Sequence, residues 1–378
     1  MIEKTMPKKI LLMSVSAGSG HVRAAEAIRA SASLYDEALE VRHLDVLDYV
    51  PTGFRKLYAE TYLNLVEKLP AVWGYLYQAS HEAKPDSTTE KIRRSVEHLS
   101  TRPLRKEITA FNPDVIVCTH FLPAEMLDRM LREGNLGCPV WVQVTDFDLH
   151  RMWVHEHMTG YFAANEEVAF RMRAAGIPSA HIHITGIPIM PAFSQPLARE
   201  VCAAEYGMDA QRTTVLLMGG GAVMNSLIEV AQSLLQIGGD FQLVVLAGRN
   251  AIVLASLQKL AVQYPGRLFP QAFTDKVERL MTCADLVITK PGGLSTSECL
   301  VKGLPVILYA PIPGQEERNA DYLLEQGVAL KACDVVTLEY RVRLLLDDSS
   351  RLATMRDKAH ALGRPDAGKQ VLETLLGE

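Results

Sequence analysis

The amino-acid sequence predicts an α/β protein of two domains, each built on a parallel β-sheet with helices on both faces. Apolar runs of strand length alternate with helical segments, which is the pattern of parallel sheets. The alternation stops in a proline-rich stretch, GIPIMPAFSQP (186–196), and then starts again. A chain of 378 residues is also long enough for two cores. We therefore expect two Rossmann-like domains that face each other across a cleft, residues 1–190 and 191–378. The last helix could pack back on the N-terminal domain.

In the first half, two predicted strands, KKILLMSV (8–15) and ALEVRHLDVL (38–47), enclose a predicted helix over residues 21–35. Residues 53–111 follow with a helical pattern that prolines interrupt. Strands and helices then alternate again. The further predicted strands are DVIVCTH (114–120), CPVWVQVTD (138–146), YFAAN (161–165) and HIHITG (181–186).

The second half repeats this order and ends in a helical segment from about residue 350. Its apolar runs are short and are separated by helical stretches, so we expect a second parallel sheet. The predicted strands are TTVLLMGGG (213–221), FQLVVLAG (241–248), RLFPQAF (267–273), DLVITKP (285–291) and LPVILYAP (304–311).

Composition excludes several classes of function. The formal net charge of -5 gives no basic field that would recruit nucleic acid. The six cysteines form no CxxC pair, which argues against a zinc site or a disulfide framework and for a reducing compartment. The apolar run near the N-terminus ends in a glycine loop, so we interpret it as a strand rather than a signal peptide. No apolar segment approaches the ~20 residues of a membrane span, so membrane contact is expected to be peripheral.

The loop after the first predicted strand, SAGSGHVR, contains Gly18 and Gly20 but matches neither phosphate-binding fingerprint. The third glycine of GxGxxG is missing, and no GK[ST] follows. The simplest interpretation is a tight turn into a helix that Ser16 or Ser19 caps. His21 then lies in the first, solvated turn of that helix.

Two glycine loops in the second half favour phosphate binding. In LLMGGGAVMN, three glycines after a strand let backbone N–H groups approach an anion at a helix N-terminus, although a flexible turn is the alternative. In ITKPGGLSTSECL, a Pro-Gly-Gly turn precedes a helix that residues 295–297 are expected to cap. The turn suits a diphosphate. Glu298 could accept hydrogen bonds from ribose hydroxyls, or serve as the acidic member of a capping box.

Two further loops carry polar side chains after predicted strands. In APIPGQEERN, Gln315, Glu316 and Asn319 open a helix and suit sugar hydroxyls, with solvated helix-start residues as the alternative. In QVTDFDLHRMWVHEH, Asp146 and Asp148 form a D-x-D, a pattern that can hold a divalent metal and a diphosphate. Three histidines in the same stretch lack the partners of a zinc site. We interpret this stretch as an active-site loop and expect no metal.

Residues 53–77 are rich in aromatic side chains. Such enrichment suits a membrane interface, with neighbouring Arg and Lys side chains available to lipid headgroups. The same enrichment is equally consistent with a helical subdomain that packs the aromatic side chains inward. The residues concerned are Phe54, Tyr58, Tyr62, Trp73, Tyr75 and Tyr77.

Together these motifs resemble the monogalactosyldiacylglycerol synthase and processive diacylglycerol glucosyltransferase group of glycosyltransferase family 28. SAGSGHVRAAEAI, LPAVWGYLY, TDFDLH and TGIPI resemble its first domain, and LAGRN, ADLVITKPGG, GLPVIL and PGQEERN its second. The resemblance covers most of the chain and implies a GT-B fold, with the UDP-sugar in the C-terminal domain and the lipid acceptor in the N-terminal domain. VITKPGG is more similar to the bacterial glucosyl enzymes, which favours glucose over galactose. AVMN departs from relatives that often carry further glycines there.

The resemblance also implies roles for single residues. His21 would be the general base at the acceptor hydroxyl, with Asp146 as a second catalytic candidate. Ribose would be bound by Glu298, the diphosphate by Gly219, Gly220, Gly292, Gly293, Ser295 and Thr296, the hexose by Gln315, Glu316 and Asn319, and uracil by Arg249 and the backbone near Phe273. On the acceptor or membrane side we place Gly20, Phe54, Tyr58, Tyr62, Trp73, Tyr75, His150 and Trp153.

The reaction so implied is inverting. A hydroxyl of diacylglycerol or a related membrane lipid attacks the anomeric carbon of a UDP-hexose, and a β-glycolipid and UDP result. Helix N-termini and backbone amides can stabilise the leaving diphosphate, so no metal or other cofactor is expected. The protein is expected at the cytoplasmic face of the membrane. A UDP-sugar epimerase, a transferase with a polyprenyl-linked acceptor and a non-catalytic UDP-sugar sensor are the alternatives.

Overall fold

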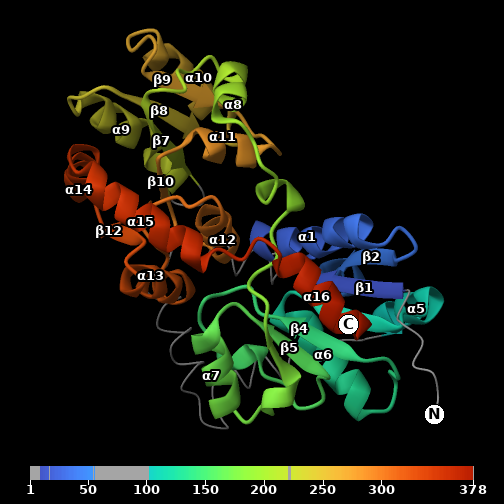
Figure 1. The fold of residues 1–378 in the computed structure, drawn as a ribbon. Coiled ribbons are helices and arrows are strands. Elements are labelled where there is room, and N and C mark those ends of the chain that lie inside the picture. The colour runs from blue at the N-terminus through green and yellow to red at the C-terminus, as the bar shows by residue number, and fades with distance from the viewer. Residues whose placement is uncertain (1–8, 17, 54, 56–101, 220–222, 378) are drawn as a thin grey trace. The chain divides into compact units, whose positions relative to one another are not determined.

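The computed structural model describes residues 9–16, 18–53, 55, 102–219 and 223–377 (Figure 1). Two compact units divide the chain. The first consists of Met1–Pro191, Pro313–Gln315 and Arg364–Glu378, and the second of Ala192–Ile312 and Glu316–Gly363. Most of the predicted helical stretch 53–111 lies outside the described residues. The structure therefore leaves the two interpretations of its aromatic segment as predictions.

In the first unit, the described strands form a parallel sheet in the order β2-β1-β3-β4-β5-β6. The strand order reverses next to β1, since β2 lies on one side of it and β3 to β6 on the other. The strands are β1 (Lys9–Ser14), β2 (Glu40–Asp45), β3 (Val115–Cys118), β4 (Val140–Gln143), β5 (Gly160–Ala163) and β6 (Ile182–Ile184).

Helices follow most of these strands, as the alternation in the sequence predicts. Ile10 and Leu12 of β1 and Phe162 of β5 are fully buried in one core, together with Ile28 of the first helix. The helices of this unit are α1 (Ser19–Tyr35), α5 (Arg102–Phe111), α6 (Phe121–Arg132), α7 (Glu166–Ala174) and α16 (Ala367–Leu376), with short 3-10 helices that include η2 (Arg151–Trp153). The 3-10 helix η4 (Pro191–Phe193) spans the boundary between the two units.

The last helix, α16, packs against α1, at the other end of the sequence (Figure 1). Val371 and Leu372 of α16 are fully buried in the core of the first unit. A Cβ atom at Gly368 would collide with the side chain of Ser31, so the absence of a side chain lets the two helices approach closely. The C-terminal residues therefore complete the first core.

In the second unit, the described strands form a parallel sheet in the order β12-β11-β10-β7-β8-β9. Counted from β7, this is the Rossmann order 3-2-1-4-5-6, whose direction reverses between β7 and β10. The strands are β7 (Thr213–Met218), β8 (Phe241–Leu246), β9 (Leu268–Gln271), β10 (Leu286–Thr289), β11 (Val306–Tyr309) and β12 (Ala329–Ala332). The helices are α8 (Arg199–Glu205), α9 (Val223–Gln236), α10 (Ala251–Ala261), α11 (Val277–Cys283), α12 (Gly293–Val301), α13 (Gln315–Glu325), α14 (Val335–Asp347) and α15 (Ser349–Leu362).

The predicted α/β class with two parallel sheets is confirmed. Each predicted strand is present but shorter than its apolar run, because the ends of those runs lead into loops. The sequence analysis missed β12, whose sequence ALKA is short and mixed in polarity. It pairs only with β11 among the described strands, so it is an edge strand.

The expected serine caps are wrong at both glycine loops. Helix α1 begins after Gly18, whose φ of 112° favours glycine, and no side chain in the described residues caps it. Helix α12 begins at Gly293 with Gly292 as its N-cap, so residues 295–297 lie inside the helix. Ser297 Oγ donates to the carbonyl of Gly293 at 2.9 Å. In both places a glycine, rather than a residue with a hydroxyl side chain, is the N-cap residue.

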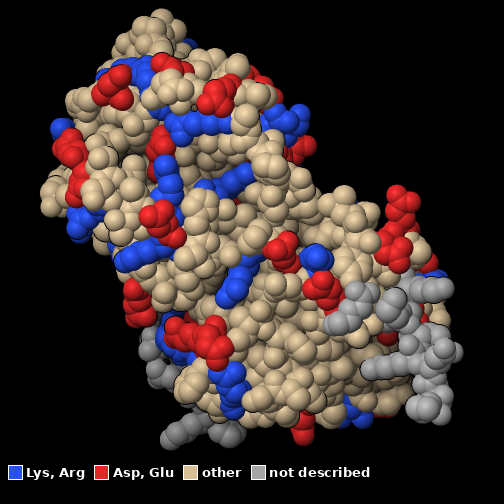
Figure 2. All heavy atoms as spheres, in the orientation of Figure 1, with Lys and Arg blue, Asp and Glu red and all other residues tan. Residues whose placement is uncertain are grey.

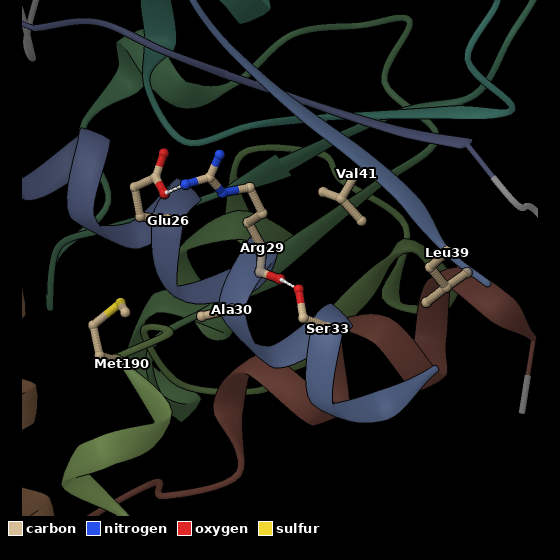
Figure 3. Close-up of a pocket in the computed structure, with 7 residues that line it drawn as sticks. All are labelled: Glu26, Arg29, Ala30, Ser33, Leu39, Val41 and Met190. Atoms are coloured by element: carbon tan, nitrogen blue, oxygen red, sulfur yellow. Dashed lines mark hydrogen bonds and ion pairs between the residues drawn. The ribbon is translucent and has the colours of Figure 1, made fainter. Parts of the chain in front are cut away.

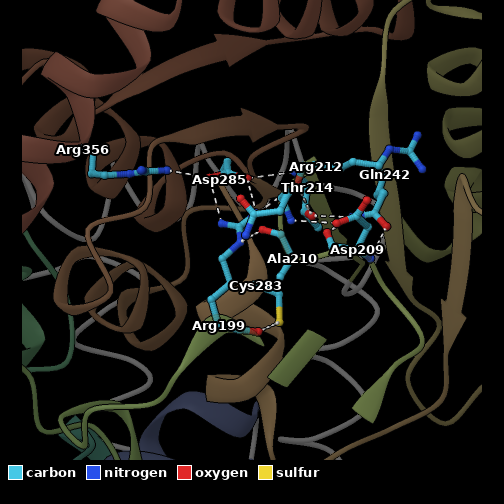
Figure 4. Close-up of polar contacts among 10 residues, drawn as sticks. Arg199, Asp209, Ala210, Arg212, Thr214, Gln242, Cys283, Asp285 and Arg356 are labelled. Atoms are coloured by element: carbon cyan, nitrogen blue, oxygen red, sulfur yellow. Dashed lines mark hydrogen bonds and ion pairs between the residues drawn. The ribbon is translucent and has the colours of Figure 1, made fainter. Parts of the chain in front are cut away.

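A polar cluster centred on Asp285 ties together several elements of the second unit (Figure 4). Arg199 donates to both carboxylate oxygens, at 3.0 and 2.7 Å, and Arg356 donates to one at 2.9 Å. The backbone N–H of Thr214 donates to the other oxygen at 2.9 Å. One carboxylate at the start of β10 thus joins α8, β7 and α15.

Charged side chains of both signs are interspersed over the face shown in Figure 2. This agrees with the formal net charge of -5, which is small for a chain of this length. Among the described residues, none of the helices combines the length and the apolar character that a membrane span requires.

Candidate active site

Among the predicted site residues of the first unit, His21 lies where the strand order reverses. In open parallel sheets, ligands bind beyond the carboxyl ends of the strands at such a point. His21 follows β1 in the first turn of α1, and Thr119 and His120 follow β3. Because β1 and β3 are neighbours, these loops meet at one edge of the sheet. Thr145, beyond β4, joins them there.

The hydrogen bonds of His21 define which ring nitrogen carries the proton. Nδ1 lies 3.0 Å from the carbonyl oxygen of Thr119 and 2.9 Å from Oγ1 of Thr145. A carbonyl oxygen only accepts, so the proton resides on Nδ1 and Nε2 is left as a proton acceptor. The hydroxyl of Thr119 in turn donates to the carbonyl of His21 at 2.9 Å. The ring is therefore held by two loops that lie far away in the sequence.

The surroundings of His21 keep its imidazole neutral. Burial lowers its pKa to about 4, and the hydrogen bond to the Thr119 backbone opposes this only in part. A histidine that is neutral near pH 7 and presents an unprotonated Nε2 is in the form that a general base requires.

Aromatic rings surround His21. The ring of His120 lies edge-on to it with a centroid distance of 4.4 Å, and the Trp153 ring lies 6.1 Å away. Trp153 also contacts Phe121 edge-on at 6.0 Å. His150 Nδ1 accepts from the N–H of Met152 at 3.2 Å and so caps η2, which carries Trp153. Trp153 and His150 are both buried: Trp153 lines the site around His21, and His150 holds the 3-10 helix that carries Trp153.

The sequence analysis missed three residues of this site, namely Thr119, His120 and Thr145. A signal was present, because the strand DVIVCTH ends in a threonine and a histidine at the same edge as the loop of His21. Gly20, which we place on the acceptor side, is the second residue of α1 and is partly exposed beside His21. Phe54, Tyr58, Tyr62, Trp73 and Tyr75 lie outside the described residues.

The two carboxylates of the D-x-D are engaged by other side chains. Asp146 Oδ1 accepts from the amide of Gln315 at 2.5 Å, within the first unit, which includes Pro313–Gln315. Asp148 forms an ion pair with Arg171 at 3.1 Å. No group of three or more His, Cys, Asp and Glu side chains in the described part of the chain is arranged to hold a metal ion.

In the second unit, every predicted donor residue that the structure describes lies beyond the carboxyl end of a strand or on the helix that follows. Gly219 directly follows β7, whereas Gly220 is outside the described residues. Gly292 follows β10, next to β7 at the reversal of strand order. A Cβ at Gly292 would meet no protein atom within 4 Å, so the packing of the chain itself does not require a glycine. Ser295, Thr296 and Glu298 follow on α12, where Thr296 is buried and Glu298 is half-buried.

Glu316, predicted to face the hexose, is held by two donors. Lys290 Nζ lies 2.6 Å from its Oε1, and the N–H of Ile312 donates to its Oε2 at 2.9 Å. Asn319 Nδ2 donates to the carbonyl of Pro291 at 3.0 Å. The start of α13 is therefore fixed to the Pro-Gly-Gly turn. Lys290 was not among the predicted site residues, although it directly follows β10 and precedes the Pro-Gly-Gly turn.

Arg249 and Phe273, predicted to lie by uracil, are in contact with each other. The Arg249 guanidinium lies over the Phe273 ring at 4.5 Å from its centroid. They follow β8 and β9, which are adjacent strands, and Phe273 is 56% exposed. An exposed ring held by a cation offers a flat face at the edge of the sheet.

An open pocket of about 430 Å³ lies elsewhere in the first unit (Figure 3). It follows α1 from Glu26 to Ser33 and is bordered by Leu39 and Val41 at the start of β2. The start of β2 is at the opposite edge of the sheet from the carboxyl ends of the strands. The pocket is therefore separate from the site around His21.

Two family models match the chain. The model of monogalactosyldiacylglycerol (MGDG) synthase matches residues 21–189, and that of the glycosyltransferase family 28 C-terminal domain matches residues 214–371. The chain belongs to glycosyltransferase family 28. The resemblance indicated by the sequence motifs is thereby confirmed, and the protein is an enzyme that transfers a sugar.

Curated relatives are similar to this family 28 enzyme over nearly its whole length. It is 27% identical over 372 residues to the processive diacylglycerol beta-glucosyltransferase of Bacillus pumilus, with 98% of this chain and 94% of that protein covered. The protein of the same name from Bacillus licheniformis is 27% identical over 381 residues, with the same coverage. Both units are included in these similarities.

Solved structures share the fold. MurG of Acinetobacter baumannii superposes with a TM-score of 0.59 at 17% identity, over 98% of this chain and 100% of MurG. UDP-GlcNAc 2-epimerase from Neisseria meningitidis, bound to UDP-GlcNAc, has a TM-score of 0.63 at 14% identity, over 98% of this chain and 100% of the epimerase. At these identities the likeness concerns the fold alone, and it confirms the predicted GT-B class.

Proposed function

We propose that this enzyme transfers glucose from UDP-glucose to a hydroxyl of diacylglycerol or a related membrane lipid and releases UDP and a β-glucolipid. The arrangement of His21 is the observation that carries the proposal. It is a neutral histidine with Nε2 available as proton acceptor at the strand-order reversal of the first sheet. The relatives named processive diacylglycerol beta-glucosyltransferase support glucose as the sugar and diacylglycerol as the acceptor.

The UDP-sugar binds in the second unit under this proposal. Gly219 and Gly292 follow the adjacent strands β7 and β10, at the reversal of strand order where dinucleotide phosphates bind in Rossmann sheets, which supports this proposal. The space beside Gly292 suits the close approach of a diphosphate to the backbone. Glu298, one turn into α12, binds the ribose, and the Arg249–Phe273 pair lies by the base. The epimerase of the same fold is bound to UDP-GlcNAc, which supports a UDP-sugar as the ligand of this fold.

The reaction proceeds by direct displacement. His21 Nε2 takes the proton of the acceptor hydroxyl while the oxygen attacks the anomeric carbon from the face opposite UDP, so the configuration inverts. Negative charge develops on the leaving diphosphate. The N-terminus of α12 and the ammonium group of Lys290 supply positive potential there. We propose that no metal ion or other cofactor is required.

The acceptor brings the enzyme to a membrane. Because diacylglycerol resides in the bilayer, we propose that the protein binds the cytoplasmic face of the membrane peripherally. The aromatic segment within residues 53–77 is the candidate for this contact.

A panel of donors and acceptors tests the proposed function. We would incubate the purified protein with UDP-glucose, UDP-galactose or UDP-GlcNAc, each with diacylglycerol, a polyprenyl phosphate or no lipid, and identify the products by mass. The expected result is a hexosyl-diacylglycerol, formed fastest from UDP-glucose. An epimerised sugar nucleotide that forms without lipid would overturn the proposal in favour of an epimerase. Binding of UDP-sugar without any product would indicate a sensor.

A further inference from the structure

The ring of His120 lies closest to His21 among the aromatic groups described above, and the two rings differ in their protonation. The backbone N–H of Leu122 donates to His120 Nδ1 at 3.0 Å. An N–H group only donates, so Nδ1 carries no proton and a neutral ring carries it on Nε2. His21 has the opposite tautomer, with its proton on Nδ1. Two adjacent imidazoles thus offer one acceptor and one donor.

His120 is buried and is held in place by its surroundings. Its side chain caps α6, its ring contacts Phe121 at a centroid distance of 4.0 Å, and Trp153 lies 6.3 Å away. Burial first, and the neighbouring His21 second, hold its pKa well below the usual value. The ring therefore stays neutral and keeps its Nε2–H as a donor near pH 7. Among the residues that the structure describes, the contacts of His120 are the helix cap through Nδ1 and the ring packing, and neither uses that donor.

Diacylglycerol offers few partners for such a donor. The attacking hydroxyl gives its proton to His21 and uses a lone pair to form the new bond, so a donor aimed at that oxygen would weaken the nucleophile. The remaining hydrogen-bond acceptors of the lipid are its ester oxygens, of which the carbonyl oxygen is the stronger. The nearest ester is separated from the free hydroxyl by only a few bonds of the glycerol.

We propose that His120 is an acceptor-binding residue whose Nε2–H donates to an ester carbonyl of the diacylglycerol and thereby orients the free hydroxyl toward Nε2 of His21. The inference rests on the proposed function and adds a determinant of acceptor specificity. His120 transfers no proton in this scheme. The hydroxyl proton moves to His21, the glycosidic bond forms, and the bond to the UDP oxygen breaks with its electrons.

Two substitutions separate this role from the helix cap. His120→Asn retains a side-chain oxygen that accepts from the N–H of Leu122, since asparagine is a good N-cap residue, but its amide is too short to reach the Nε2 position. His120→Gln places an amide N–H near the Nε2 position. Each variant is assayed with a diacylglycerol and with the dialkyl ether of the same chain lengths, which lacks the carbonyls.

In the wild-type enzyme, kcat/KM for the diester should exceed kcat/KM for the diether by about tenfold, because only the diester can accept a hydrogen bond from the buried donor. His120→Asn should lower kcat/KM for the diester about tenfold. It should leave kcat/KM for the diether nearly unchanged and the KM of UDP-glucose unchanged. His120→Gln should restore part of the preference. In both variants kcat/KM should still fall at low pH, because this acid limb reflects the protonation of His21.

Three results would overturn the inference. Equal rates of wild type on diester and diether would exclude a carbonyl partner without the need for any variant. An equal loss on both lipids in His120→Asn would indicate a structural role only. Loss of the acid limb in that variant would make His120 the base. If wild type glycosylates neither lipid, the proposed function itself fails, which is distinct from a glucolipid synthase that ignores the carbonyl.

Discussion

His21 has the properties of a base because of its contacts rather than its residue type. The carbonyl of Thr119 fixes the proton on Nδ1, and the surrounding protein atoms disfavour the charged ring. Either contact alone would be insufficient, since a neutral ring of the wrong tautomer presents an N–H to the substrate. The two together prepare Nε2 for proton transfer.

Replacement of His21 tests this role. His21→Ala should lower kcat for glucolipid formation by at least ~10²-fold, the lower range for loss of a general base. The exposed His181 provides a matched control, and His181→Ala should be near wild type. Near-normal turnover of His21→Ala would move the role of base to Asp146.

The pH dependence tests the environment of the ring. A base must be unprotonated, so activity falls as the pH falls through its pKa. Because burial lowers the pKa of His21 to about 4, the acid limb of kcat/KM should lie near pH 4 rather than near 6.5. A profile from pH 3.5 to 8, corrected for stability, measures it. An acid limb near pH 6.5 would show that the His21 ring is solvated in the active enzyme.

Replacement of Glu298 tests the proposed donor site. Glu298→Ala should raise the KM for UDP-glucose about tenfold, as expected for lost hydrogen bonds between ribose hydroxyls and a carboxylate, while the KM for the lipid stays unchanged. Glu317→Ala, on the helix after the next strand, serves as the control. An unaltered donor KM would contradict ribose binding.

At the scale of the elements, two features of the second unit position the loops that we propose to bind the donor. The Lys290–Glu316 pair and the Asn319 amide fix α13 to the Pro-Gly-Gly turn, and the Asp285 cluster joins α8 and α15 to the sheet (Figure 4). Neither feature follows from local sequence, because the partners come from different strands and helices. Their geometry depends on the order of the strands.

Removal of the charge at Asp285 should loosen these elements. Asp285→Asn leaves Arg199 and Arg356 facing a neutral amide, and we expect a loss of about 3 kcal/mol in the free energy of unfolding, measured in urea. Asp240→Asn is the control, since Asp240 pairs with Arg212 in a largely exposed position. Equal stabilities of the two variants would contradict a structural role of the cluster.

The same carboxylate predicts a response to acid. Burial raises the pKa of Asp285, but its hydrogen bonds to Arg199 and Thr214 and the nearby guanidinium of Arg356 leave the pKa below the usual 3.8. Its contribution to stability is therefore present above about pH 4 and is lost as the pH falls through the lowered value.

At the scale of the whole molecule, the last residues of the chain belong to the same unit as the first. Arg364–Glu378 belong to that unit, and α16 fills its core beside α1. The two units are thus not simple halves of the sequence. The predicted ranges of 1–190 and 191–378, with their acceptor and donor roles, remain predictions as functional domains.

The contact between α1 and α16 can be tested at Gly368. Gly368→Leu should force the helices apart and lower the free energy of unfolding by about 1–3 kcal/mol, the usual range for overpacking. Lys369→Leu, at an exposed neighbouring position, is the control and should change stability by less than about 0.5 kcal/mol. Thermal melting measures both. Equal melting temperatures would contradict close packing at Gly368.

The sequence by itself determined the two parallel sheets and the family, and it supplied the loops that we propose to carry function. Alternating apolar and helical segments specify such sheets locally, and the glycine loops and His21 belong to continuous motifs. Only the tertiary structure decided the state of the active site. Thr119 and Thr145 lie 98 and 124 positions from His21, and they reach it because β1 pairs with β3 and β3 with β4. Strand order is a long-range property, so the tautomer of His21 and the neighbouring donor on His120 could not be derived from the motif alone.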